Sequence, residues 1–414
     1  MQHPKNIAIE AFSYHLPDER IAKYPLLQRD ASKLLVYKKG TISQSVYASL
    51  ADFLPADTLM VFNNTKVVEA RLLFQKETGG LVELFCLEPS SKYPDITHAM
   101  LQKGNVVWKC LIGGAKKWKT GFLTKTVNIT EGTLQIKAEK IGTEADSFMI
   151  AFSWNMPELS FAEILHYAGN IPLPPYLNRE AEKADAETYQ TVYAKHDGSV
   201  AAPTAGLHFT NELLQKLHDK GIQQQFITLH VGAGTFKPVK AKKMEDHEMH
   251  EEFIDVSLNF IQLLASKASN TIVAVGTTSL RTIETLYWMG VKLLHIPKNM
   301  QQVTIADISV RQWDPYELTS NFSLQQSLLA LANWMELHAI QQLITKTQII
   351  IAPGYQLKVA SGIITNFHQP QSTLLLLISA VVGNDWKRIY NYALENDFRF
   401  LSYGDGSLLW DVNR

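Results

Sequence analysis

The pattern of hydrophobic and polar positions changes along the chain, and these changes divide it into regions. From about residue 161 onward, apolar runs of strand length alternate with segments of helical periodicity. The clearest unit covers residues 270–290, where TIVAV predicts a buried strand and Leu280 onward predicts a helix that ends at Gly290. Strands that alternate with helices favour an α/β sheet for this part of the chain.

The segment from residue 72 to residue 150 has a different pattern. Short β-rich runs recur between glycines and polar turns, and no long 3.6-residue period occurs. The runs are LVELFCL, VVWKCLI, TVNIT, TLQIKAEKI and SFMIAFSW. Several short strands at this spacing predict a small antiparallel barrel or sandwich.

The stretch from Gly169 to Thr210 is too irregular for an ordinary core element. IPLPPY holds three prolines, which exclude a central strand or a helix interior because proline lacks a backbone donor. Further on, SVAAPTAGLHFT places small residues around His208. This pattern fits either a surface against which a flat ring lies or a packed loop with a core histidine.

Two further segments suggest ligand chemistry. The predicted strand from Phe226 to Val231 is followed by a glycine loop with Gly232 and Gly234, at the strand end where open α/β sheets bind ligands. The loop continues into TFKPV and not into a helix, so it is no dinucleotide fingerprint. In HEMHEE the two histidines are three residues apart, which differs from HExxH and favours a charged loop or helix end over a zinc site.

A candidate anion site follows the strand TIVAV. Thr277, Thr278 and Ser279 lie at the predicted helix start, and Arg281 lies in its first turn. Free amides and hydroxyls at a helix N-terminus bind a carboxylate or a phosphate. Plain capping of the helix by Thr or Ser is the alternative, and both can coexist.

Imidazoles near predicted strand ends are the candidates for proton transfer. They are His208, His230 and His368, accompanied by the amides of Asn63, Asn64 and Asn366 and by the carboxylates of Asp30 and Asp405. Arg29 and Asp30 form either a local ion pair or a pair that lines a site. A GxSxG elbow and a P-loop are absent, so serine hydrolysis and phosphoryl transfer from ATP are disfavoured. A metal-free transferase remains.

Composition adds limits to this interpretation. With 46% hydrophobic and 19% charged residues and a net charge of −1 over 414 residues, the chain is an ordinary globular protein and no basic nucleic-acid binder as a whole. A local cluster of Lys116, Lys117 and Lys119 around Trp118 fits either a phosphate backbone or a solvated hairpin face.

The cysteines and the apolar runs bear on location. The two cysteines form no CxxC pair, which fits a reducing cytosol and no structural metal. We expect no signal peptide, and the longest apolar run, at 374–383, is too short to span a bilayer. We therefore expect a cytoplasmic protein without membrane contact.

Longer segments follow one another in order along nearly the whole chain. They are PLLQRDASKLLV, VFNNTKVVEARL, GNIPLPPYL, YQTVYAKHDGSVAAPTAGLHFT, TLHVGAGTFKPV, HEMHEE, VGTTSLRT, PGYQLKV, TNFHQPQSTLLLLISA and FRFLSYGD. Together these segments closely resemble the S-adenosylmethionine:tRNA ribosyltransferase-isomerase family of queuosine biosynthesis. The resemblance is strongest over residues 169–236 and 361–380.

The resemblance implies a tRNA-modifying transferase and isomerase. Such enzymes join the ribosyl part of S-adenosylmethionine to 7-aminomethyl-7-deazaguanine at the tRNA wobble position, which gives epoxyqueuosine and releases adenine and methionine. The implied fold is an α/β main domain, residues 1–71 and 151–414, with an inserted small antiparallel β-barrel domain, residues 72–150. S-adenosylmethionine is the expected co-substrate, precursor tRNA the expected partner, and we expect a monomer that needs no metal.

The resemblance also suggests roles for the candidate residues. Because the sulfonium acidifies the adjacent C5′ hydrogen, a base can start the reaction, and we predict His208 or His230 as this base. His368 and Asn366 are predicted near the nucleobases. The remaining residues are predicted to bind one of the two substrates. Those predicted to bind S-adenosylmethionine are Gly232, Gly234, Thr277, Thr278, Ser279, Arg281 and Asp405. Those predicted to bind tRNA are Arg29, Asp30, Asn63, Asn64, Lys116, Lys117 and Lys119.

Three departures from the family pattern leave alternatives open. The family commonly has an arginine in place of Lys33, NDTR in place of the NNTK at 63–66, and an alanine-containing ending where this chain has Gly406-Ser407. Lys66 in place of arginine loses a bidentate fork. A diverged paralogue with another acceptor is one alternative, and a non-catalytic RNA-binding protein on the same scaffold is the other.

Overall fold

The larger sheet forms the centre of the molecule. The computed structural model describes residues 3–76, 78–144, 147–232, 241–297 and 299–413. Within these residues, nine strands form one mixed sheet in the order β16-β14-β13-β3-β15-β17-β18-β1-β2. Its four central strands are mutually parallel: β13 (Gln223–His230), β3 (Leu59–Asn63), β15 (Ile272–Val275) and β17 (Gly362–Asn366).

The strands outside this parallel centre complete the sheet. On one side, β14 (Glu252–Ser257) runs antiparallel to β13, and β16 (Gln342–Thr347) runs antiparallel to β14. On the other side, β18 (Gly406–Trp410) runs antiparallel to β17, β1 (Lys33–Lys38) parallel to β18, and β2 (Thr41–Val46) antiparallel to β1. The α/β fold predicted for the main part of the chain is confirmed, with antiparallel strands at both sides of its parallel centre.

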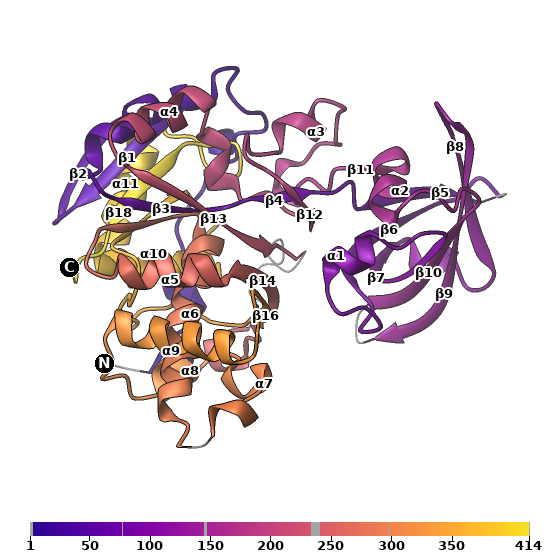
Figure 1. The fold of residues 1–414 in the computed structure, drawn as a ribbon. Coiled ribbons are helices and arrows are strands. Elements are labelled where there is room, and N and C mark those ends of the chain that lie inside the picture. Colours follow the sequence, from indigo (N-terminus) through magenta and orange to yellow (C-terminus); the bar gives the residue numbers. More distant parts are fainter. Residues whose placement is uncertain (1–2, 77, 145–146, 233–240, 298, 414) are drawn as a thin grey trace.

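Helices cover both faces of the sheet (Figure 1). Leu59 and Val61 of β3 face a cluster formed by α5 (Leu258–Ser266), α6 (Thr277–His295), α9 (Leu324–Leu337), α10 (Thr373–Val382) and α11 (Trp386–Glu395). Met60 and Phe62 point to the other face, toward α4 (Asn211–Asp219) and the 3₁₀ helices η5 (Tyr47–Phe53) and η8 (Thr204–His208). Because side chains alternate along the strand, β3 contributes residues to two hydrophobic cores, one on each face of the sheet. Short helices α3 (Asp185–Thr188), α7 (Ile305–Ile308) and α8 (Asp314–Glu317) lie in the connections.

The unit at residues 270–290 forms as a strand and a helix, but the predicted helix end at Gly290 is wrong. α6 continues for five more residues, to His295. A Cβ atom at Gly290 would lie 1.9 Å from the carbonyl oxygen of Ser327 in α9. The glycine therefore permits close approach of two helices and does not end the first one.

The predicted turn at Asn63 and Asn64 joins strands of two different sheets. Asn63 is the last residue of β3, and β4 (Thr65–Val67) leaves the large sheet to pair with β12 (His196–Ser199). The buried side-chain amide of Asn63 extends the hydrogen-bond pairing between β3 and β13. Its Nδ2 donates to the Leu229 carbonyl at 2.9 Å, and its Oδ1 accepts from the Leu229 backbone N–H at 3.0 Å.

The second large sheet lies to one side of the main body (Figure 1). Among the described residues it has seven antiparallel strands in the order β11-β5-β6-β7-β10-β9-β8. They are β5 (Arg71–Gln75), β6 (Leu81–Pro89), β7 (Asn105–Gly113), β8 (Phe122–Ile129), β9 (Gly132–Glu144), β10 (Ser147–Trp154) and β11 (Gly169–Asn170). α1 (Ile96–Met100) and α2 (Phe161–Ala168) pack into the same core.

This sheet curls around its core, but among the described residues no backbone hydrogen bonds between its two outer strands close it into a barrel. Its outer strands β5 and β8 approach each other, and Lys125 Nζ donates to the Leu73 carbonyl at 3.1 Å. No strand pairing joins β5 to β8 in the part of the chain that the structure describes. The predicted barrel is therefore present only as a curled antiparallel sheet. None of the described helices is long and apolar enough to cross a membrane.

A buried carboxylate on α6 fixes the segment that leads into β17. Glu284 is fully buried and accepts hydrogen bonds from the Tyr355 hydroxyl at 2.6 Å and from the amides of Lys358, Val359 and Ala360 at 2.8, 2.9 and 3.1 Å. Burial raises the pKa of Glu284, while these four donors lower it. The carboxylate thus joins the helix to the start of the strand two residues further along.

We expect Glu284→Gln to destabilise the protein. One carboxylate oxygen becomes an NH₂ group, which then faces two of the four donors, so the free energy of unfolding should fall by about 3 kcal/mol. Chemical denaturation measures the change, and the same substitution at exposed Glu395 is the control. Equal stability of both variants would contradict this account of Glu284.

Candidate functional site

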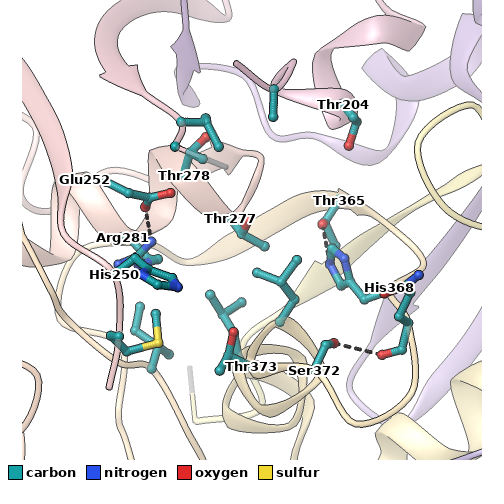
Figure 2. Close-up of a pocket in the computed structure, with 18 of the residues that line it drawn as sticks. Thr204, His250, Glu252, Thr277, Thr278, Arg281, Thr365, His368, Ser372 and Thr373 are labelled. Atoms are coloured by element: carbon teal, nitrogen blue, oxygen red, sulfur yellow. Dashed lines mark hydrogen bonds and ion pairs between the residues drawn. The ribbon is translucent and has the colours of Figure 1, made fainter. Parts of the chain in front are cut away.

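The main cavity lies at the carboxyl ends of the parallel strands. β13, β15 and β17 end at the same edge of the sheet, where open α/β sheets bind ligands. A cavity of about 570 Å³ opens there. Its wall is formed by the start of α6, the residues that follow β17, the start of α10, the segment 246–252 and the loop 201–204. In Figure 2, Arg281 and Glu252 lie on one side and Thr365 and His368 on the other, with Thr277 between them.

The start of α6 offers unpaired backbone donors to the cavity. Gly276 precedes the helix with φ of 90°, a conformation that residues with a Cβ rarely adopt, and no side chain of the described residues caps the helix. The first amides of a helix have no acceptor within it. Thr277 and Thr278 line the cavity, and the Thr278 hydroxyl lies 3.4 Å from Asn63 Nδ2. The sequence predicts an anion site at these residues; of them, Ser279 has a buried side chain and does not line the cavity.

One turn further, Arg281 brings a buried positive charge to the same wall. It is 7% exposed; its Nη1 forms an ion pair with Glu252, and its Nε donates to the Ile349 carbonyl at 3.1 Å. Nη2 is buried and has no hydrogen-bond partner among the described residues. Because an unpaired buried donor is unfavourable, this edge of the guanidinium suits an anionic ligand.

The opposite wall carries Asn366 and His368, at and just beyond the end of β17. His368 Nε2 lies 2.9 Å from the Thr365 hydroxyl, and the His368 amide donates to the Tyr390 hydroxyl at 3.0 Å. Burial lowers the pKa of His368 to about 3, so the imidazole is neutral at physiological pH. A neutral imidazole has a lone pair that can accept a proton, but a pKa of about 3 makes it a weak base near neutral pH.

Asn366 is held by both of its amide hydrogens. Nδ2 donates to the Leu401 carbonyl at 3.2 Å and lies 3.1 Å from His208 Nε2. Oδ1 is buried and lacks a partner in the described part of the chain. Arg281 on one wall and Asn366 on the other therefore each hold a buried polar atom, a donor and an acceptor respectively, that has no partner among the described residues.

The other two predicted imidazoles do not line this cavity. His208 lies behind Asn366 and stacks on Tyr47 with a ring separation of 4.3 Å. His230 ends β13, and its Nδ1 lies 3.1 Å from the Thr65 hydroxyl. Burial lowers the pKa of His208 to about 3, and the positive charges of Arg399 and Arg29 lower it further. Burial lowers the pKa of His230 to about 4, and His196 acts in the same direction.

An acidic segment that the sequence identified only as a charged loop forms a third wall. The loop before β14 lines the cavity with the side chains of Asp246, His247, Glu248, His250, Glu251 and Glu252. Burial lowers the pKa of His247, with a contribution from His250. Four carboxylates on one wall favour a ligand with a positive charge. In the described residues, no group of three or more His, Cys, Asp or Glu side chains could hold a metal ion.

The remaining predicted residues divide into those near and those away from the cavity. Gly232 lines it, whereas Gly234 lies outside the described residues. Arg29 donates to the carbonyls of Gln190, Glu187 and Thr188. Asp405 accepts from the amides of Lys33 and Arg399.

Other predicted residues take part in local contacts or lie on the surface. The Thr210 hydroxyl donates to Asp30, and the Thr228 hydroxyl donates to Asn64 Oδ1. Lys116, Lys117 and Lys119 are exposed on the second sheet, in the turn between β7 and β8. None of these residues lines the cavity.

Sequence reasoning missed several residues of the wall. They are Tyr176, Tyr189, Thr204, Gln369, Ser372 and Thr373, together with the acidic residues of the loop 246–252. The density of carboxylates in the segment 245–252 was the available signal for the acidic wall.

Comparison with known proteins places the chain among relatives that match it along almost its whole length. A family model described as "Queuosine biosynthesis protein" matches residues 9–409. A protein of Trichlorobacter lovleyi named S-adenosylmethionine:tRNA ribosyltransferase-isomerase is 36% identical over 406 residues, 97% of this chain and 99% of that protein. A protein of the same name from Thermosynechococcus vestitus is 35% identical over 99% of this chain and 98% of that protein. A solved S-adenosylmethionine tRNA ribosyltransferase from Thermotoga maritima is 26% identical, with 96% of this chain and 99% of that chain covered and a TM-score of 0.44.

The low pKa of His230 predicts a loss of stability in acid. Between pH 6.5, the ordinary value for histidine, and about 4, the folded value, the unfolded chain binds one more proton at this side chain. The free energy of unfolding is therefore highest above pH 6.5 and falls toward pH 4. In His230→Gln this fall should be less steep by about 1.4 kcal/mol per pH unit. Denaturation across this range measures the slope; His218→Gln, at an exposed position of α4, is the control and should keep the wild-type slope.

Proposed function

Because the chain belongs to the family of queuosine biosynthesis proteins, we propose that it is an S-adenosylmethionine:tRNA ribosyltransferase-isomerase. It transfers the ribosyl part of S-adenosylmethionine to 7-aminomethyl-7-deazaguanine at the tRNA wobble position and isomerises it, with release of adenine and methionine. The observation that carries the proposal is the cavity, which is lined by Arg281 on one wall and by Asn366 and the neutral imidazole of His368 on the other; Arg281 Nη2 and Asn366 Oδ1 have no partner among the described residues.

The α6 wall is the proposed site of the methionine carboxylate. Arg281 Nη2 and the amides at the start of the helix provide donors without partners, and Thr277 and Thr278 add hydroxyls. A carboxylate that accepts hydrogen bonds from a guanidinium and from the amides of a helix N-terminus is bound by electrostatic attraction and oriented by the hydrogen bonds. The Glu252 ion pair holds the guanidinium in place for this contact.

The acidic wall suits the positive charges of the same substrate. S-adenosylmethionine carries a sulfonium and an ammonium group, and Glu248 and Glu251 lie in the cavity wall beside Glu252. Opposite charges in a cavity of low dielectric constant attract more strongly than in water. This wall therefore favours the cationic substrate over a neutral thioether product.

His368 is the proposed group for proton transfer at the reacting atoms. The reaction removes a proton from the carbon beside the sulfur and supplies one to the departing adenine. His368 is neutral and reaches the cavity, and the Thr365 hydroxyl holds its ring. The other two predicted imidazoles, His208 and His230, are separated from the cavity by other side chains, so we place them in support of the site.

For tRNA we propose a contact with the second sheet. Lys116, Lys117 and Lys119 are exposed on one turn, and the Lys140 ammonium lies within 5.9 Å of the Trp118 ring. Clustered lysines bind a phosphate backbone without reading its sequence, so this contact should weaken steeply with salt. The wobble base itself must reach the cavity at the sheet edge.

The departures from the family pattern are not among the residues that line the cavity, although the Ser407 hydroxyl donates to the carbonyl of the lining residue Thr365 at 3.2 Å. Lys66 pairs with Asp197 at 3.4 Å on the surface, and Lys33 Nζ donates to the Asn396 carbonyl at 2.8 Å. Lys33, Asn64, Lys66, Gly406 and Ser407 are not among the lining residues. This placement favours the family reaction over a changed acceptor.

We expect Arg281→Lys to weaken the binding of S-adenosylmethionine by roughly 10- to 100-fold, because a charged hydrogen bond to the carboxylate is lost. Calorimetry with the protein alone measures this change. The matched ligand is decarboxylated S-adenosylmethionine, whose affinity should be similar in both proteins. Equal weakening for both ligands would contradict the assignment of Arg281 to the carboxylate.

We expect His368→Gln to lower the rate of adenine release by about 100-fold or more while tRNA binding is retained. Labelled S-adenosylmethionine is incubated with protein and precursor tRNA, and free adenine is measured; His218→Gln is the control. Adenine that appears only with tRNA supports the transferase. Tight tRNA binding without adenine indicates an RNA-binding protein, and release with another small acceptor indicates a paralogue. Unchanged turnover in His368→Gln would exclude His368 as the proton-transfer group.

A further inference from the structure

The side-chain amide of Asn366 is fixed in one orientation. The Leu401 carbonyl can only accept a hydrogen bond, so the group 3.2 Å from it must be the NH₂ group of Asn366. Oδ1 consequently points away from Leu401. Asn366 is 3% exposed and lines the cavity, and its Oδ1 has no partner among the described residues.

His208 adds a second constraint on the same amide. Nδ2 of Asn366 is a donor, so His208 Nε2, which lies 3.1 Å away, must present a lone pair. The His208 proton is then on Nδ1, which agrees with a hydrogen bond from this imidazole to the backbone of Arg29. Stacking on Tyr47 with an interplanar angle of 21° keeps the ring from turning. A protonated His208 would place two donors against each other, and burial disfavours that state.

Together these contacts change what the amide can recognise. A free asparagine side chain both donates and accepts, and it can turn over to suit its ligand. Here both N–H groups are used, by Leu401 and His208. The only capacity left is acceptance at Oδ1, and an unpaired buried acceptor is unfavourable until a donor reaches it.

We propose that Asn366 Oδ1 accepts a hydrogen bond from an amino group of the bound substrate, and that His208 is the positioning residue that keeps the amide in this orientation. The inference rests on the proposed function and adds a specificity element to it. The candidate donors are the exocyclic amine of adenine and the aminomethyl group of the acceptor base; the ammonium group of S-adenosylmethionine is assigned to the acidic wall. A carbonyl or ether oxygen in the same place would meet the lone pairs of Oδ1 and be rejected.

The test compares ligands that differ only in an amino group. The first pair is S-adenosylmethionine and its 6-deamino analogue. The second pair is tRNA that carries 7-aminomethyl-7-deazaguanine and tRNA that carries 7-methyl-7-deazaguanine. Equilibrium binding is measured for each ligand without its co-substrate, so that no turnover occurs. The wild-type protein should prefer the amino ligand of one pair by about tenfold.

Three variants separate positioning from folding. Asn366→Ala removes the acceptor. His208→Gln keeps an oxygen that can accept from Asn366 Nδ2, whereas His208→Asn keeps a donor for the Arg29 backbone but is too short to reach Asn366. Both His208 variants disturb the same buried site, so thermal unfolding should be affected similarly, and only His208→Gln should retain the tenfold preference.

The outcomes distinguish this inference from the function on which it rests. A preference within the S-adenosylmethionine pair that is lost in Asn366→Ala and His208→Asn supports the inference, with adenine as the donor. The same result within the tRNA pair supports it, with the acceptor amine as the donor. An unchanged preference in Asn366→Ala, or equal preference in both His208 variants, overturns the inference and leaves the function intact. If the wild-type protein binds neither S-adenosylmethionine nor the tRNA, the proposed function fails, and the inference fails with it.

Discussion

The hydrogen bonds of Glu284 fix the two walls of the cavity relative to each other. The carboxylate lies on α6, the same helix that presents Thr277 and Arg281 to the cavity, and it holds three consecutive amides of the segment that enters β17. β17 in turn carries Asn366, and His368 follows two residues later. Because the interaction is buried and has four donors, it allows little variation in the separation of the walls. The relative position of the α6 wall and the wall that follows β17 therefore depends on it.

The cavity combines a rigid frame with polar groups that the fold leaves unpaired. Arg281 Nη2 and Asn366 Oδ1 are both buried without partners among the described residues. Such groups lower stability unless a ligand supplies the missing partner, so they are typical of sites that are organised before binding. The buried, neutral His368 belongs to the same arrangement, since burial keeps its proton-accepting form populated. The rigid frame, the polar groups without described partners and the neutral imidazole thus all lie at the same edge of the large sheet.

The sequence predicted the elements of this edge better than the functions of its side chains. Strand β15 and the start of α6 follow from local patterns of apolar, hydroxyl and glycine residues. Local patterns do not reveal that Asn366 lies between His208 and the cavity, because this depends on residues 158 positions apart. The ion pair of Arg281 with Glu252 and the contacts of Glu284 are long-range in the same way. The closure of the second sheet was equally undetermined, since strand spacing does not specify whether the first and last strands pair.

The ion pair between Arg281 and Glu252 has a further consequence for the total charge of the site. Glu252 already balances the guanidinium, so a bound carboxylate would leave two negative charges and one positive charge on this wall. Glu248, which also lines the cavity, increases the excess, whereas Glu251 is paired with Lys346 at 2.7 Å. A simple carboxylic acid would therefore bind against a net repulsion, whereas a zwitterion brings its own positive charge. A ligand that places a carboxylate on this wall is thus favoured when it also carries positive charge.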